Sequence, residues 1–167
     1  SKHPMESSVY ITPEVVSVLP DSGTVGTLVT VSGTGYGVGE VLRVGFGKTM
    51  TIVTGTASND GTFTTVFTVD TQGYATKTIT VEGVQTLHPA TNTFFILPEI
   101  VGMTPTRGTV GTFVTVDCTG YGSGETVRVD LGKTAGIVLP VASLDGTFTT
   151  VFTIDTQAYA TRTVTVE

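Results

Sequence analysis

Two Gly-Lys-Thr tripeptides are the part of this sequence that most suggests chemistry, because the same residues end a phosphate-binding loop. They stand at 47–49 and 132–134. The first glycine of such a loop should lie five residues earlier, where this chain has Leu42 and Val127. No helical pattern follows to direct a helix dipole at a phosphate. We therefore expect no nucleotide site at either tripeptide.

Acidic residues that occur in both halves of the chain are the candidate ligands for a metal ion. They are Asp60, Asp70, Asp145 and Asp155. Two carboxylates per half could hold calcium together with backbone carbonyls. The sequence has no dense Asp-x-Asp run, which favours aspartates that form turns. His3 and His88 have no cysteine or second histidine nearby, so we expect no metal site at either of them.

Catalytic residue sets are not evident. No Ser-His-Asp or Cys-His set recurs in both halves, and we expect neither enzymatic activity nor a cofactor. Cys118 is the only cysteine and cannot form an internal disulfide. Its counterpart in the first half is Gly33, which favours a small apolar side chain over a reactive thiol or an intermolecular bridge. Four tyrosines also recur and are expected to cap the core rather than bind sugar: Tyr36, Tyr74, Tyr121 and Tyr159.

Composition excludes two classes of partner. The net charge is −6 and the eight Lys and Arg residues are scattered, which argues against nucleic acid. No apolar run approaches the roughly 18 residues of a membrane span. The chain begins at Ser rather than Met, as would a processed secreted protein or a fragment cut from a longer one.

The chain consists of two copies of one module. Residues 13–82 match residues 98–167 without a gap, at a period of 85 residues. Such a period indicates a repeated domain rather than a solenoid, and it suits a small β-sandwich. We call residues 13–97 repeat one and residues 98–167 repeat two.

Strand and turn signals alternate every 8 to 12 residues within a repeat. The strands expected in repeat one are 15–19, 27–31, 41–46, 51–56, 63–69, 75–81 and 93–97. Glycines 33, 35, 37 and 39 indicate a turn around Tyr36, and Asn59-Asp60-Gly61 indicates a hairpin turn. Seven strands without a helical period predict an all-β fold of two tandem immunoglobulin-like antiparallel β-sandwiches.

Both repeats follow, with a few substitutions, the motif order GTxVTVxGxGY, GExVxVxFG, DGTFTTxFTV, YxTxTITVEG and NTFFI, the last one present only in repeat one. This order resembles the bacterial and archaeal Ig-like surface modules of the IPT/TIG type. The resemblance implies sandwiches strung along secreted or cell-surface proteins. It also implies that the last strand, TNTFFIL, closes a sheet.

The first twelve residues resemble that closing strand. SKHPMESSVYIT (1–12) aligns with TLHPATNTFFIL (86–97), with His-Pro in the same place and an apolar triplet near each end. Both stretches lead directly into Pro-Glu. Repeat two stops at the equivalent of Glu82, so its last strand is the piece that residues 1–12 resemble, and only the equivalents of 83–85 are unaccounted for.

These features predict exchange of a strand between chains. Residues 1–12 form a donor strand, 13–97 a complete domain, and 98–167 a domain whose last strand comes from a neighbouring subunit. Closure within one chain would require repeat one at both ends of repeat two. The expected donor residues are Ser7, Ser8, Val9, Tyr10, Ile11 and Thr12. The expected acceptor residues are Val101, Met103, Tyr159, Thr161, Val164 and Val166.

The resulting hypothesis is a secreted structural subunit that forms a head-to-tail homopolymer, an extracellular or pilus-like filament at the cell surface with possible glycan contacts. One alternative is a spacer or stalk fragment of a larger adhesin or surface-layer protein, whose chain continues past Glu167. Another is a non-catalytic binding module, which an exposed aromatic patch present only in repeat two would favour.

Overall fold

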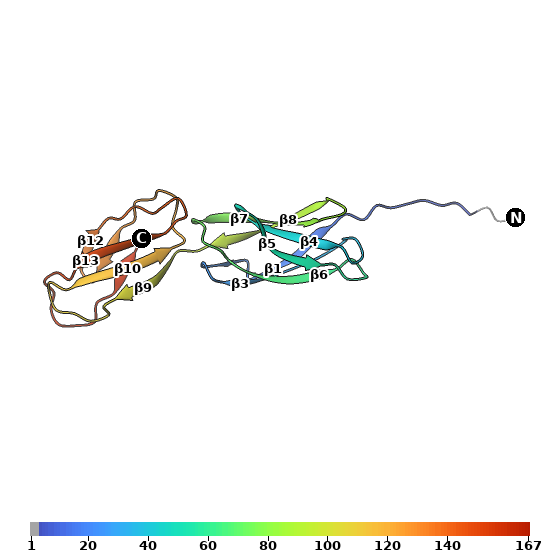
Figure 1. Ribbon diagram of the computed structural model, residues 1–167. Coiled ribbons are helices and arrows are strands. Elements are labelled where there is room, and N and C mark those ends of the chain that lie inside the picture. The colour runs from blue at the N-terminus through green and yellow to red at the C-terminus, as the bar shows by residue number, and fades with distance from the viewer. Residues whose placement is uncertain (1–3) are drawn as a thin grey trace. The chain divides into compact units, whose positions relative to one another are not determined.

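The computed structural model describes residues 4–167, and these form an all-β structure without a helix (Figure 1). None of the described residues therefore forms a helix that could cross a membrane. The strands are β1 (Glu14–Leu19), β2 (Ser22–Gly23), β3 (Leu28–Thr34), β4 (Val41–Phe46), β5 (Thr49–Thr56), β6 (Phe63–Thr68), β7 (Ala75–Gly83), β8 (Pro89–Ile96), β9 (Glu99–Thr104), β10 (Phe113–Thr119), β11 (Val129–Leu131), β12 (Thr134–Val138), β13 (Phe148–Thr153) and β14 (Val164–Val166).

By packing, the chain divides into two compact units. One contains Thr30–Phe67, Thr78–Thr93 and the residues up to Leu19, and the other contains Pro20–Val29, Thr68–Lys77 and Phe94–Glu167. This division does not follow the period of the sequence. The domain boundaries at 12/13 and 97/98 therefore stay predictions.

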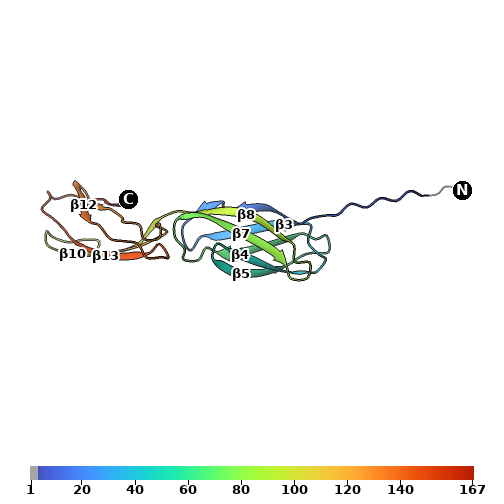
Figure 2. The ribbon, with the colours of Figure 1, turned by 90° about the horizontal axis from the view of Figure 1, so that it is seen from above.

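Repeat one contains two sheets, as the alternating pattern predicts. One has the strand order β1-β3-β6 and the other β2-β8-β7-β4-β5, with β8 running beside β7 (Figure 2). Apolar residues on one face of each strand form the core. Phe46 of β4 and Phe67 of β6 belong to different sheets, and their ring centroids lie 5.2 Å apart. The predicted inward side chains Ile79 and Val81 are both fully buried.

Three details of the predicted repeat were wrong. The structure has eight strands here, since the two-residue β2 pairs in parallel with β8 and is too short to show alternation. Gly33 belongs to β3, where it pairs with Val15, and not to the glycine-rich turn. The Asp60-Gly61 turn joins β5 to β6, which lie in different sheets, so it is a connection between sheets and not a hairpin.

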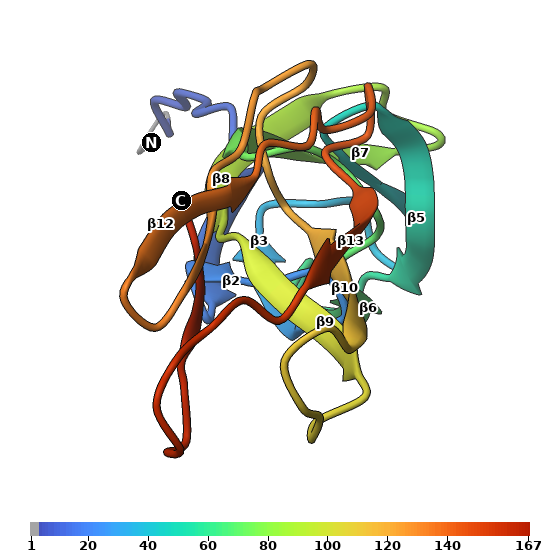
Figure 3. The ribbon, with the colours of Figure 1, turned by 90° about the vertical axis from the view of Figure 1, so that its left-hand side faces the viewer.

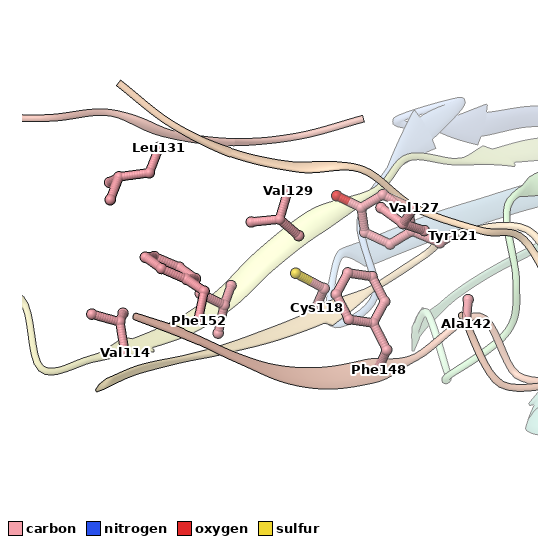
Figure 4. Close-up of a cluster of buried hydrophobic side chains, with 10 residues drawn as sticks. Val114, Cys118, Tyr121, Val127, Val129, Leu131, Ala142, Phe148 and Phe152 are labelled. Atoms are coloured by element: carbon pink, nitrogen blue, oxygen red, sulfur yellow. The ribbon is translucent and has the colours of Figure 1, made fainter. Parts of the chain in front are cut away.

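Repeat two has sheets of order β13-β10-β9 and β12-β11-β14. Figure 3 shows β9, β10 and β13 on one side and β12 on the other. Their facing side chains form one apolar cluster (Figure 4). Cys118 is a member of it and is 3% exposed. Burial, with a further contribution from the Asp117 carboxylate, raises the pKa of its thiol to about 11. The predicted small apolar role of Cys118 is confirmed.

Gly33 and its counterpart Cys118 should differ in how well each position accepts a substitution. A Cβ at Gly33 would lie 2.4 Å from the carbonyl oxygen of Glu14 and 2.5 Å from Cε1 of Phe63. We expect Gly33→Cys to lower the free energy of unfolding by about 1–3 kcal/mol, because the clash forces neighbours to shift. The control is Cys118→Ala, with an expected cost of about 1 kcal/mol. Denaturant melts of both variants check this, and equal losses would contradict it.

Candidate strand-acceptor site

The Gly-Lys-Thr tripeptides form tight hairpin turns. In the first, Phe46 pairs with Thr49 and Gly47 has a φ of 52°, which suits the first position of a two-residue loop. In the second, Leu131 pairs with Thr134. No helix among the described residues follows either tripeptide.

The repeated aspartates belong to turns and local hydrogen bonds. Hydrogen bonds from the Thr134 hydroxyl and from the Gln157 amide lower the pKa of Asp155. The backbone N–H of Asp60 donates to Ser58 Oγ at 3.3 Å. Among residues 4–167 no group of three or more His, Cys, Asp or Glu side chains could hold a metal ion. His3 lies outside the described residues.

The four tyrosines divide into two pairs. Tyr36 and Tyr121 are each 6% exposed and pack edge-on against phenylalanine, so they cap the core as predicted. Tyr74 is 50% exposed and Tyr159 fully exposed, so for these two the prediction was wrong. Tyr74 packs edge-on against Phe95 of β8, with ring centroids 5.0 Å apart. Tyr159 has no counterpart of Phe95 within residues 98–167.

Strand β8 closes repeat one. It lies between β7 and β2, and its side chains Phe94 and Ile96 are 1% and 0% exposed. The N–H of Phe95 donates to the Asp21 carbonyl at 2.9 Å, and the N–H of Leu97 donates to the Gly23 carbonyl at 2.8 Å. The closing strand thus adds both a hydrogen-bonded ladder and two large core side chains.

Repeat two has an open edge at the equivalent place. Strand β14 keeps the register of β7, since Leu131 pairs with Val164 as Phe46 pairs with Ile79. It has three residues where β7 has nine, and within the described chain it lies at the edge of its sheet. The counterpart of β2, residues 107–108, is exposed and forms no strand. An open edge of this kind can pair with another strand.

Equivalent side chains differ in burial between the two repeats. Val164 and Val166 are partly exposed, whereas their counterparts in repeat one are fully buried. Ile100 is 38% exposed, whereas its counterpart Val15 is 6% exposed. Met103 is likewise only partly buried and packs against the core cluster. These apolar side chains mark where a closing strand would cover repeat two.

Two of the expected acceptor residues do not differ between the repeats. Val101 is 63% exposed, but its counterpart Val16 is 60% exposed in the closed repeat. Thr161 is exposed, as is its counterpart Thr76 in β7. A closing strand would therefore leave both side chains in solvent. Ile100 is the residue of this strand that the sequence reasoning missed, because an extra residue in β9 shifts which side chains point inward.

The predicted donor residues form no strand in the structure. Residues 4–12 are exposed and form an extended segment without secondary structure (Figure 1). Val9, Tyr10 and Ile11 are 89%, 71% and 72% exposed, and Tyr10 lies edge-on to His88 with a centroid distance of 6.0 Å.

The junctions that lead into the two repeats share one geometry. A Cβ at Gly35 would lie 2.5 Å from the carbonyl oxygen of Thr12, and one at Gly120 would lie 2.4 Å from that of Leu97. The residue before each Pro-Glu thus packs on the same glycine of its repeat. Thr12 therefore precedes repeat one in the same way as Leu97, just after β8, precedes repeat two.

A buried carboxylate also distinguishes the closed repeat. Glu40 is 0% exposed and accepts hydrogen bonds from the N–H groups of Gly37, Gln85 and Thr86 at 2.9, 2.9 and 2.7 Å. Burial by itself raises its pKa, but these bonds together with one from the Thr86 hydroxyl outweigh burial and lower the pKa of Glu40 below the usual glutamate range. Its counterpart Glu125 is exposed and accepts a bond from Gly122 N–H at 2.6 Å.

Acidification should therefore destabilise repeat one through Glu40. A carboxylate with a lowered pKa adds stability above the pKa of the unfolded chain, and this is lost as the pH falls through the folded value. We expect β8 of the wild type to lose hydrogen-exchange protection as the pH falls below the ordinary pKa of a glutamate. Glu40→Gln should flatten this dependence and cost about 1–3 kcal/mol at neutral pH. An unchanged pH dependence in Glu40→Gln would contradict the assignment.

No protein-family model matches the chain, and no curated protein matches it. The resemblance to IPT/TIG modules therefore rests on the sequence motifs. Similar solved structures include a biofilm-associated protein BSP domain, the full extracellular region of plexin A4 and dimeric latent PorU from Porphyromonas gingivalis.

Sequence identities to these three structures are 21%, 16% and 12%, and the TM-scores are 0.34, 0.34 and 0.32. The alignments cover 93%, 94% and 94% of this chain but 26%, 14% and 24% of the other chains, so the chain spans about a quarter or less of their length. At these scores no functional conclusion follows from the likeness.

Proposed function

We propose that this chain is a structural subunit of an extracellular filament, in which residues 7–12 of one copy close repeat two of the next. The observation that carries the proposal is the difference between the repeats at equivalent positions. Ile79 and Val81 are fully buried where β8 is present, and Val164 and Val166 are partly exposed where no such strand is present. Residues 1–12 carry the sequence pattern of the strand that makes this difference.

The alignment assigns a place to each donor side chain. Val9 and Ile11 take the positions of Phe94 and Ile96, which are buried in repeat one. Tyr10 takes the position of Phe95 on the opposite face. Because Phe95 packs edge-on against Tyr74, Tyr10 would cover Tyr159 of the acceptor in the same manner.

Buried side chains and main-chain hydrogen bonds would both contribute to the affinity of the proposed contact. Each apolar side chain of this size contributes about 1.5–3 kcal/mol when buried, so Val9 and Ile11 together supply about 3–6 kcal/mol. Main-chain hydrogen bonds to β14 and to residues 107–108 add affinity, as in other complexes that extend a sheet. The donor and the acceptor are different surfaces, so the contact is head-to-tail and propagates. Thr12–Pro13 would then repeat the Leu97–Pro98 junction at each new subunit.

A spacer or stalk of a larger cell-surface protein is the second candidate. The observation in its favour is that β8 closes repeat one from within the same chain. A continuation of the chain could close repeat two in the same way. A binding module receives less support, since the counterpart of the exposed Tyr159 packs against a closing strand.

Electron microscopy of negatively stained protein separates these functions. Residues 1–167 are compared with a variant that lacks residues 1–12. We expect filaments from the first and monomers from the second. Folded monomers in both samples would contradict strand exchange and favour the stalk.

A further inference from the structure

The turn between β6 and β7 makes a main-chain contact with repeat two. The N–H of Tyr74 donates to the Tyr121 carbonyl at 2.9 Å. A Cβ on Gly73 would lie 3.0 Å from the same carbonyl oxygen, and a Cβ on Gly146 would lie 2.6 Å from Gly73 Cα. Thr68–Lys77 and all of repeat two belong to one compact unit, so this contact is part of the packing of that unit.

The surface that receives Tyr74 has an equivalent in repeat one. Tyr121 N–H donates to the Gly146 carbonyl at 3.0 Å, and the N–H of its counterpart Tyr36 donates to the Gly61 carbonyl at 3.1 Å. A Cβ on Gly61 would lie 2.5 Å from the Tyr36 carbonyl oxygen, so a glycine is needed beside this carbonyl too. No backbone N–H within residues 4–167 donates to the Tyr36 carbonyl. The described chain thus has this acceptor twice and fills it once.

The turn that donates has an equivalent in repeat two. The Gln72 amide donates to the Asp70 carboxylate at 2.7 Å, and the Gln157 amide donates to the Asp155 carboxylate at 2.6 Å. The two turns therefore begin with the same local bond, but their exposure differs. Gln72 is 2% exposed, whereas Gln157 is only partly buried. The turn is more covered in the repeat where it contacts a second repeat.

Two positions at this contact differ between the repeats, and they differ in the same sense. A Cβ on Gly73 would lie 3.6 Å from the backbone N of Ser123. The counterparts of these two residues are Ala158 and Val38, which are both exposed, Val38 by 69%. The free surfaces thus carry apolar groups where the paired surfaces carry a hydrogen and a hydroxymethyl group. Those apolar groups would leave water if the two free surfaces met.

We propose that the turn 157–159 of one copy docks on Tyr36, Val38 and Gly61 of the next copy, with Tyr159 N–H donating to the Tyr36 carbonyl. The partner is a second copy of this chain, because the chain's own turn 72–74 contacts the equivalent surface of repeat two. This inference rests on the proposed function, which places repeat one of one copy directly after repeat two of another. It adds a second contact between the same two subunits.

The donor strand would prepare the docking turn. The ring of Tyr74 packs edge-on against Phe95 of β8, which supports the turn whose N–H reaches Tyr121. Tyr159 is fully exposed in the subunit. Tyr10 of the incoming strand takes the place of Phe95, so the ring of Tyr159 gains the same support when that strand is bound. Docking of the turn therefore follows insertion of the strand.

The test substitutes arginine for Ala158 in the full chain. Ala158 is exposed, so the melting temperature of the unassembled subunit should stay within about 2 °C of the wild type. Between subunits the larger side chain would separate the turn from Tyr36. Loss of the hydrogen bond should raise the critical concentration for assembly about tenfold. The matched control is Thr156→Arg, because its counterpart Thr71 is exposed beside the existing contact. Its critical concentration should stay within about twofold of the wild type.

A charge swap tests whether the two surfaces meet. Val38→Glu should weaken assembly to a similar degree and leave the subunit folded, because Val38 is exposed there. Ala158→Arg and Val38→Glu combined in one chain place the arginine of each copy against the glutamate of the next. The combination should recover most of the lost assembly.

The outcomes separate this contact from the proposed function. Additive losses in the double variant, equal losses in Ala158→Arg and Thr156→Arg, or wild-type assembly by Ala158→Arg would overturn the contact alone. If residues 1–167 do not assemble, or assemble equally well without residues 1–12, the contact and the proposed function fail together.

Discussion

Replacing Ile11 with aspartate is expected to abolish assembly and leave the subunit folded. The side chain is 72% exposed in the subunit, so the substitution costs little there. In the filament it would take the position of Ile96, which is 0% exposed. The lost burial costs about 2 kcal/mol, and moving a carboxylate out of water costs at least a few more. Together these correspond to a loss of at least about a thousandfold in affinity.

The matched control is Ser8→Asp, which adds the same charge to the same strand. Its counterpart Thr93 is exposed in the closed repeat, so Ser8 should face solvent in the filament. We expect its affinity to change by no more than a few fold. Sedimentation and electron microscopy measure both variants. Similar behaviour of the two would mean that charge, and not the buried face of the strand, controls assembly.

The substitution Phe94→Ala in repeat one is expected to lower the free energy of unfolding strongly. Phe94 lies in β8 and is 1% exposed, so its truncation leaves a cavity in the core. Such truncations cost about 3–5 kcal/mol, which is a large part of the stability of a small domain. Urea unfolding followed by hydrogen exchange at β7 and β8 measures the loss.

Phe95→Ala is the control, because Phe95 is half-buried on the other face of β8 and packs against Tyr74. Loss of that aromatic pair should cost about 0.5–1.5 kcal/mol. If Phe95→Ala cost as much as Phe94→Ala, the assignment of an inner and an outer face to β8 would be wrong. The assignment of Val9 and Ile11 to the inner face of the donor would then fail with it.

Much of the fold could be predicted from the sequence because alternation and turn residues are strong here. The internal match places β1, β3, β4, β5, β6 and β7 of repeat one onto β9 to β14 of repeat two. Phe63, Phe67 and Val69 are buried as the alternating pattern predicts. Two features depend on long-range packing and were missed. Strand β2 exists through its pairing with β8. Gly33 pairs with Val15 inside β3, and a glycine is needed there because a Cβ would clash with Glu14 and Phe63.

The candidate site could be predicted only in outline. Val164, Val166 and Met103 follow from alternation, and all three are partly buried in repeat two. Ile100 does not follow, since irregular pairing in β9 changes the inward face near Val101.

The central claim is that the donor of one copy meets the acceptor of another. The most direct measurement mixes a donor-blocked variant, Ile11→Asp, with an acceptor-blocked variant, Ile100→Asp, and determines the molar mass by light scattering. Ile100 is 38% exposed in the open repeat but aligns with the buried Val15 of the closed one, so the substitution should block strand entry more than folding. We predict that each variant alone is monomeric and that the mixture forms a one-to-one complex and nothing longer. Monomers in the mixture, or polymers of either variant alone, would contradict strand exchange between subunits.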